Sequence, residues 1–138
     1  MRLLPSIAAV VIVVGYFAFE VSNLHRLRYR MEPLYIFDQF ASAHIAIQHC
    51  GTPDDEERRR FARNFNYVTR RAVEDTVEPV NPDSDDQQRK ADAEGSIRNR
   101  LELRRQEVEA LLAAQGCQGA DLRKLVKFHE IRARLNVG

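Results

Sequence analysis

The chain contains 138 residues, with 21 Lys or Arg against 20 Asp or Glu, so its formal net charge is +1. This near-neutral balance provides no overall positive field, and nucleic acid is therefore not an expected partner. Tryptophan is absent, and one N-terminal apolar run is followed by polar sequence with helical periodicity, which predicts an all-α fold.

The first element is the apolar run from Leu3 to Phe19, which is interrupted only by Pro5 and Ser6. As a helix it would span roughly 26 Å, slightly short of a hydrocarbon core of roughly 30 Å. Apolar residues just beyond the run extend it. We therefore expect one transmembrane helix within residues 1–24.

A cleaved signal peptide is the main alternative, because Met1 and Arg2 form a short basic start. Cleavage requires small residues at the −3 and −1 positions, and Phe17-Ala18-Phe19 does not supply them. A buried core helix is the third alternative. It is disfavoured because the run is apolar on every side.

A basic juxtamembrane segment follows at residues 25–33, where Arg26, Arg28 and Arg30 are candidates for contact with anionic lipid headgroups. The same arginines are compatible with the solvated end of a long helix. Counted by the positive-inside rule, they favour a cytoplasmic domain. The two cysteines discussed below favour export, and we expect a single-pass inner-membrane protein with a periplasmic domain.

The first helical hairpin is expected at residues 34–77. Its first helix carries a stripe with alternating spacings of four and three and stops at Gly51. Thr52 then resembles an N-cap ahead of Pro53. The second helix is expected to end near Val77, because proline follows at position 79. The two apolar stripes are Ile36, Phe40, Ala43, Ile47 and Cys50, and then Phe61, Phe65, Val68 and Ala72.

An acidic linker is expected at residues 78–95, where six acidic residues stand against two basic ones. The part from Ser84 or Asp85 onward is also compatible with the exposed start of the next helix. The second hairpin is expected at residues 96–138 and turns at Gly116. Its helices carry Ile97, Leu101, Arg104, Val108 and Leu111, and then Leu122, Leu125, Val126 and His129. The fold is thus predicted to be a small bundle of about four helices arranged as two hairpins.

The two cysteines, Cys50 and Cys117, fall at the tips of the two predicted hairpins. Equivalent placement predicts a disulfide between them, and such bonds persist in oxidising compartments. Two unrelated buried thiols are the alternative.

The sequence gives little support for metal binding or catalysis. The residues His44, His49, Cys50, Cys117 and His129 have poor spacing for a metal site, and no CxxC motif occurs. Paired carboxylates fall at helix starts or in the linker, where capping explains them. Phosphate-binding loops and nucleophile elbows are absent. We expect no enzyme activity, no cofactor, no metal and no small-molecule substrate.

Charge clusters are interpreted as solvated helix faces. This applies to the groups Arg58-Arg59-Arg60 and Arg70-Arg71, because acidic residues lie four positions away from some of their members. The C-terminal helix is more strongly basic, with Arg123, Lys124 and Lys127 on it. Pairing of these residues with the acidic linker of the same domain is the preferred interpretation, and docking on an acidic partner or a membrane surface is the alternative.

These patterns favour a non-enzymatic, membrane-anchored accessory or assembly subunit of a larger inner-membrane complex. Its helical domain would dock on partner subunits. The candidate partner surface comprises Phe37, Ala41 and His44, or the basic residues Arg123, Lys124 and Lys127. A periplasmic chaperone or stress-response binding protein is the alternative function.

Overall fold

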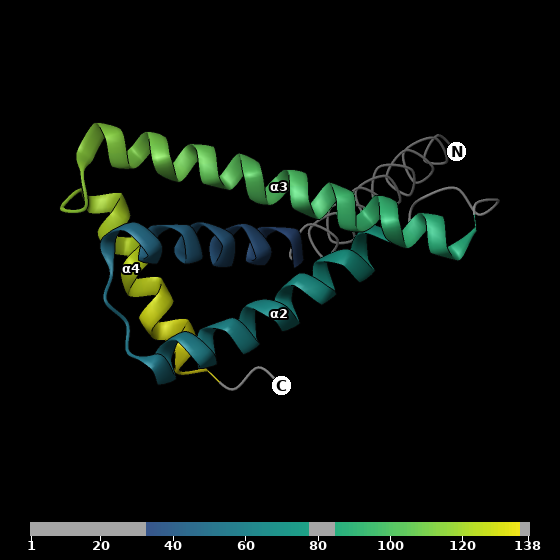
Figure 1. The fold of residues 1–138 in the computed structure, drawn as a ribbon, viewed down its shortest axis with the longest axis horizontal. Helices are drawn as coiled ribbons and strands as arrows, with labels where there is room; N and C mark the ends of the chain where they lie inside the picture. Colours follow the sequence, from purple (N-terminus) through teal and green to yellow (C-terminus); the bar gives the residue numbers. More distant parts are fainter. Residues whose placement is uncertain (1–32, 78–84, 136–138) are drawn as a thin grey trace, which may run out of the picture. The chain divides into compact units, whose positions relative to one another are not determined.

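The computed structural model describes residues 33–77 and 85–135, which form four α-helices and no strand (Figure 1). These are a first helix at residues 33–50, α2 (Asp55–Val77), α3 (Asp86–Gln115) and α4 (Ala120–Ala133). The prediction of an all-helical bundle is confirmed for this part of the chain. The described residues all belong to one unit, Pro33–Gly138.

The predicted anchor at residues 1–24 lies outside the described residues, as do Arg26, Arg28 and Arg30. Within residues 33–77 and 85–135, each helix is too short or too polar to cross a bilayer.

The turn between the first helix and α2 occupies residues 51–54. The Gly51 amide donates to the carbonyl of Ile47 at 3.1 Å, which closes the last turn of the first helix. The carboxylate of Asp54 accepts the Glu57 amide at 2.7 Å, so Asp54 caps α2. The predicted cap, Thr52, is therefore wrong by two positions. An ionised carboxylate directly before the helix satisfies a free amide and also complements the helix dipole.

The helix α3 begins at Asp86, and the Asp85 carboxylate accepts the Gln87 amide at 3.4 Å. Residues 86–95, assigned above to an acidic linker, are therefore helical. Their sequence is polar but rich in good helix formers and free of proline. The helix ends at Gln115, and the next residue, Gly116, has a φ of 64°, in the left-handed region that favours glycine.

The first helix contributes side chains to the whole length of the core. Around Phe37 and Phe40 it meets α2, α3 and α4 through Phe61, Ile97 and Ala133. A second cluster joins its Ile45 and Ala46 to Val108 of α3 and Leu122 of α4. Because it touches three helices, it is buried on more than the single face that the predicted stripe marks.

An aromatic cluster fills the contact between the first helix, α2 and α4. The Phe40 ring stacks on Phe61 at 5.3 Å and meets the edge of Phe128 at 5.6 Å. Phe65 lies 5.8 Å from Phe37. Each such pair contributes about 0.5–1.5 kcal/mol beyond its buried area, so this cluster is a major source of cohesion.

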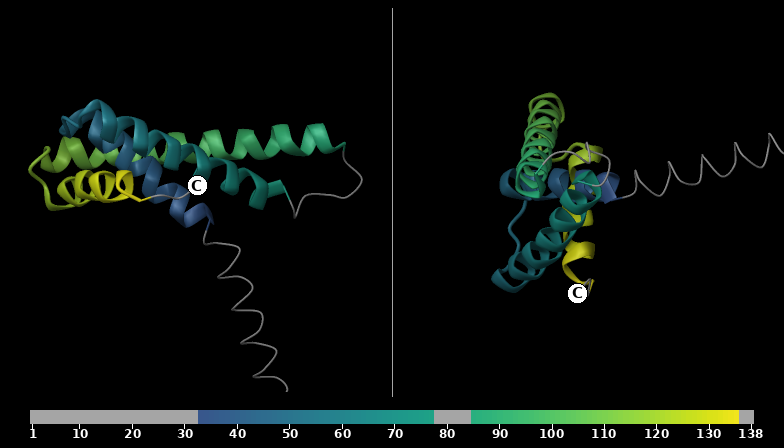
Figure 2. Two further views of the ribbon diagram at one scale, coloured as in Figure 1. Left: turned by 90° about the horizontal axis from the view of Figure 1, so that it is seen from below. Right: turned by 90° about the vertical axis from the view of Figure 1, so that its right-hand side faces the viewer.

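Two polar contacts join helices that are distant in sequence. Arg100 of α3 donates two hydrogen bonds of 2.6 Å to the carboxylate of Asp38 in the first helix. The side-chain amide of Asn64 in α2 donates to the carbonyls of Arg132 and Leu135, at 2.7 and 2.8 Å. One of these carbonyls lies in the last turn of α4 and the other just beyond it, so Asn64 joins α2 to the C-terminal end of α4. Figure 2 shows the same helices from two further sides.

Candidate functional site

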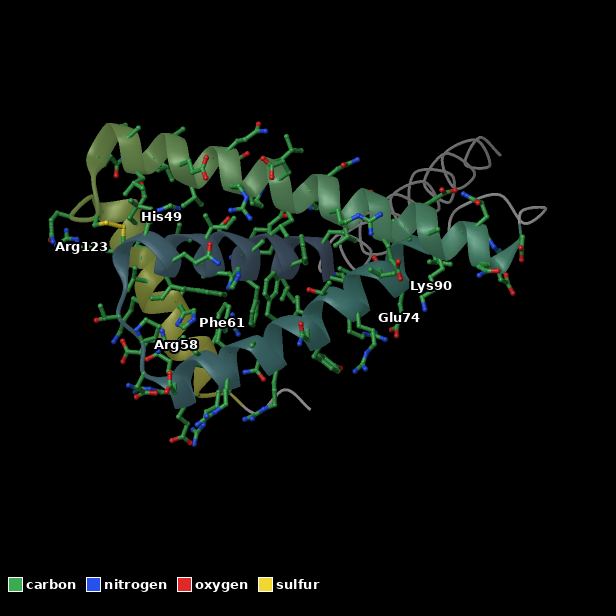
Figure 3. All side chains as sticks on the ribbon, viewed as in Figure 1. His49, Arg58, Phe61, Glu74, Lys90 and Arg123 are labelled. Atoms are coloured by element: carbon green, nitrogen blue, oxygen red, sulfur yellow. A yellow bond between two sulfur atoms is a disulfide. The ribbon has the colours of Figure 1, made fainter. Side chains whose placement is uncertain are left out.

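One end of the bundle is closed by a disulfide. Cys50, the last residue of the first helix, is bonded to Cys117 in the turn after α3, with their Cα atoms 5.3 Å apart. The predicted disulfide is confirmed. Figure 3 shows the sulfur–sulfur bond at the end of the bundle that also carries Arg123.

The disulfide removes both thiols from metal binding and nucleophilic chemistry. Within residues 33–77 and 85–135, no three His, Cys, Asp or Glu side chains gather as a metal site would require. The side chain of His49 is exposed beside Cys50.

A buried histidine lies near the start of α2. His129 of α4 is 2% exposed, and its Nδ1 lies 2.7 Å from Oε1 of Glu57. Its ring stacks on Phe61 with a centroid distance of 4.0 Å. The sequence placed His129 on the apolar stripe of the last helix, and the side chain is buried there. Its partner was not visible in the sequence, because Glu57 is distant along the chain.

A recess of about 370 Å³ opens beside this pair, and both His44 and His129 line it. Burial lowers the pKa of His44 below its usual value, and the nearby His129 and Arg105 lower it further. His44 is therefore predominantly neutral at pH 7. The other lining residues are Ile47, Gln48, Gly51, Pro53, Arg58, Phe61 and Ala62. The residues that line the recess include two imidazoles but no hydroxyl or thiol.

The predicted partner surface divides into buried and exposed residues. Phe37 is 1% exposed and Ala41 is fully buried, because both pack in the core. Their assignment to a partner surface is therefore corrected: neither side chain is available to a docking protein. His44 is half-buried against Phe61 and Phe65.

The basic residues predicted on the last helix do lie on its exposed side. Lys124 pairs with Asp121 at 3.9 Å and Lys127 with Glu130 at 2.8 Å. Arg123 is exposed and makes no ion pair with the described residues. This helix also exposes Ile131. The outer face of α4 thus combines positive charge with apolar surface.

The arginines of α2 form a second exposed feature, which the sequence interpretation treated as uniformly solvated. Half of them are paired on the surface, namely Arg58 with Asp55, Arg60 with Glu56 and Arg71 with Glu74. Arg59, Arg63 and Arg70 make no ion pair with the described residues. Spacing along the sequence does not distinguish the paired arginines from the unpaired ones, because it does not show which arginine each acidic residue contacts.

Comparisons of this chain with protein-family models, curated proteins and solved structures find no match.

Proposed function

We propose that this chain is a non-enzymatic, membrane-anchored accessory or assembly subunit of a larger inner-membrane complex. The observation that carries the proposal is the outer face of α4, where Arg123, Lys127 and Ile131 are exposed on a helix whose other side is locked into the bundle. A fixed helix face with apolar and basic groups is suited to protein docking.

The spacing of these residues supports the assignment of one docking face. Arg123, Lys127 and Ile131 are each four residues apart, so they follow one side of the helix. Leu122, His129 and Ala133 lie on the opposite, buried side. An exposed apolar residue beside charged groups suits an interface with a desolvated centre and a polar rim.

The bundle itself is suited to a scaffold. Its interior is occupied by aromatic and aliphatic side chains, and the Cys50–Cys117 disulfide closes one end. Little reorganisation is then needed on binding, which lowers the entropic cost of association. The apolar run from Leu3 to Phe19 supports attachment to the same membrane as the partner.

The test is purification of the tagged full chain from source membranes in mild detergent, with co-purifying proteins identified by mass spectrometry. Ile131→Glu on α4 is compared with Leu103→Glu on α3, because both residues are large, apolar and exposed. We expect the unsubstituted chain to recover a membrane complex at fixed stoichiometry. Ile131→Glu should lose it and Leu103→Glu should keep it.

Two outcomes would contradict the proposal. Recovery of the chain alone would remove the subunit assignment. Recovery with a variable set of proteins would favour the periplasmic chaperone or stress-response binding protein. Circular dichroism of both variants shows whether a lost partner reflects a lost fold.

A further inference from the structure

The exposed side of α2 carries an unusual concentration of arginine. Residues 58–73 contain six arginines and neither aspartate nor glutamate. Figure 3 shows nitrogen-tipped side chains along the outer side of α2, while the labelled Phe61 points into the bundle. The charge is therefore displayed away from the core.

Three of these arginines form a continuous stripe with one tyrosine. Arg59, Arg63, Tyr67 and Arg70 are spaced by four, four and three residues, which places them on one helix face. All four are exposed, and the stripe extends over roughly 16 Å. The opposite face packs in the core through Phe61, Val68 and Ala72. We call Arg59, Arg63, Tyr67 and Arg70 the α2 stripe.

The stripe is the part of α2 whose positive charge is not compensated. Arg58, Arg60 and Arg71 flank it and are paired with Asp55, Glu56 and Glu74. No described carboxylate pairs with the three stripe arginines. Separate charges of one sign held at helical spacing repel each other, and an anionic surface relieves that repulsion.

The chemistry of the stripe fits phosphate. Guanidinium groups bind phosphate through two parallel hydrogen bonds, which a lysine cannot do. Tyr67 is 38% exposed, and the Arg70 guanidinium lies 5.7 Å from the centre of its ring. Tyrosine prefers the headgroup level of a bilayer, where its ring and hydroxyl meet different surroundings.

We propose that the α2 stripe binds the anionic headgroups of a phospholipid membrane and holds the bundle against the bilayer surface. The membrane is favoured over other polyanions because the same chain carries the apolar run from Leu3 to Phe19. The Cys50–Cys117 bond also favours oxidising compartments, in which nucleic acid is not a usual partner. The inference rests on the proposed function only for the attachment to a membrane.

The expected strength follows from charge. Each arginine near an anionic bilayer strengthens binding about fivefold, so three together change the docking equilibrium by on the order of a hundredfold. Loss of all three arginines should therefore release the bundle from the bilayer surface, while the apolar run keeps the chain attached to the membrane.

The test places the full chain in nanodiscs of either purely zwitterionic or partly anionic phospholipid. Hydroxyl-radical footprinting then measures protection of Tyr67, with the exposed Leu103 of α3 as an internal reference. The stripe variant is Arg59→Gln/Arg63→Gln/Arg70→Gln. The matched control, Arg58→Gln/Arg60→Gln/Arg71→Gln, removes the same charge from the same helix but from paired positions.

We expect Tyr67 to be protected in anionic discs only, in the unsubstituted chain and in the control but not in the stripe variant. Equal protection in both lipids, or equal loss in both variants, would overturn the inference. Protection that requires an added acidic protein would also overturn it, as would stripe-dependent binding of an oligonucleotide that displaces anionic vesicles.

Flotation of the chain with zwitterionic vesicles in high salt separates this inference from the proposed function. A chain that floats but shows no lipid-dependent protection retains its anchor and refutes the stripe. A chain that fails to float but binds anionic vesicles through the stripe refutes the anchor instead.

Discussion

Removal of the disulfide should destabilise the bundle more than any single surface change. The perturbation is Cys50→Ala, Cys117→Ala and the double variant, each in the full chain. Every one of the three abolishes the same bond. The two single substitutions and the double substitution should therefore cost nearly the same free energy of unfolding, and their effects should not add.

The magnitude follows from the loop that the bond closes. A sequence separation of 67 residues between the bonded cysteines corresponds to about 4 kcal/mol of chain entropy in the unfolded state. Loss of the Cys50 sulfur from its contacts beside Ile45 adds less than about 1 kcal/mol, because the side chain is only partly buried. A small domain has only about 5–15 kcal/mol of stability, so the bond supplies a large fraction of it.

Urea unfolding monitored by circular dichroism in mild detergent measures the effect. With a slope of about 2 kcal/mol/M, the midpoint should fall by about 2 M. The slope itself should rise, because an uncrosslinked chain exposes more surface when it unfolds. A cost below about 1 kcal/mol, or additive effects of the two single substitutions, would refute the reasoning.

Three further predictions concern other contacts. Arg100→Met should cost about 1–3 kcal/mol of unfolding free energy, because it leaves the half-buried Asp38 carboxylate without its two hydrogen bonds; a loss no larger in Arg100→Met than in Asp38→Asn/Arg100→Met would contradict this. Asn64→Ala should cost a similar amount and accelerate amide exchange at the end of α4, and unchanged exchange there would contradict this role of Asn64. Burial lowers the folded-state pKa of His44, so the unfolded state takes up its proton first and stability should fall as pH drops below about 6.5. His44→Gln should reduce that fall in urea titrations at pH 7.5 and pH 5, and an equal fall in both proteins would show that other groups cause it.

The sequence predicted those features that depend on local signals. Gly51 and Gly116 ended two helices where expected, because glycine at these positions is a local conformational signal. The disulfide was predicted because its cysteines lie next to the same two glycines. Local sequence signals were therefore sufficient to locate both turns and the disulfide that joins them.

The errors arose where burial depends on the number of neighbouring helices. Phe37 was assigned to a surface because a single stripe was taken as the only buried face of its helix. The helix contacts α2, α3 and α4, so residues outside that stripe are buried as well. The sequence left the start of α3 open, because polarity at residues 86–95 is compatible with both a linker and an exposed helix, and the structure shows the helix.

Long-range polar partners were also invisible in the sequence. Helical periodicity placed His129 on the apolar stripe of its helix, but its contact with Glu57 joins two helices that no periodicity relates. The α2 stripe was missed for a different reason. The structure shows that the neighbouring acidic residues pair with Arg58, Arg60 and Arg71, and only this pairing distinguishes the stripe arginines from the others.

The disulfide also determines at which end of the bundle local unfolding begins. One end is closed by the Cys50–Cys117 bond. Toward the other end, where α2 stops and α3 begins, the buried residues include the small side chains of Ala72 and Ala93. Small side chains bury little apolar area, so partial unfolding should start there and proceed toward the covalent end. Amide protection should accordingly increase along α3 from its N-terminus toward Val108. Backbone amides at the two ends of the bundle should therefore exchange with solvent on different timescales.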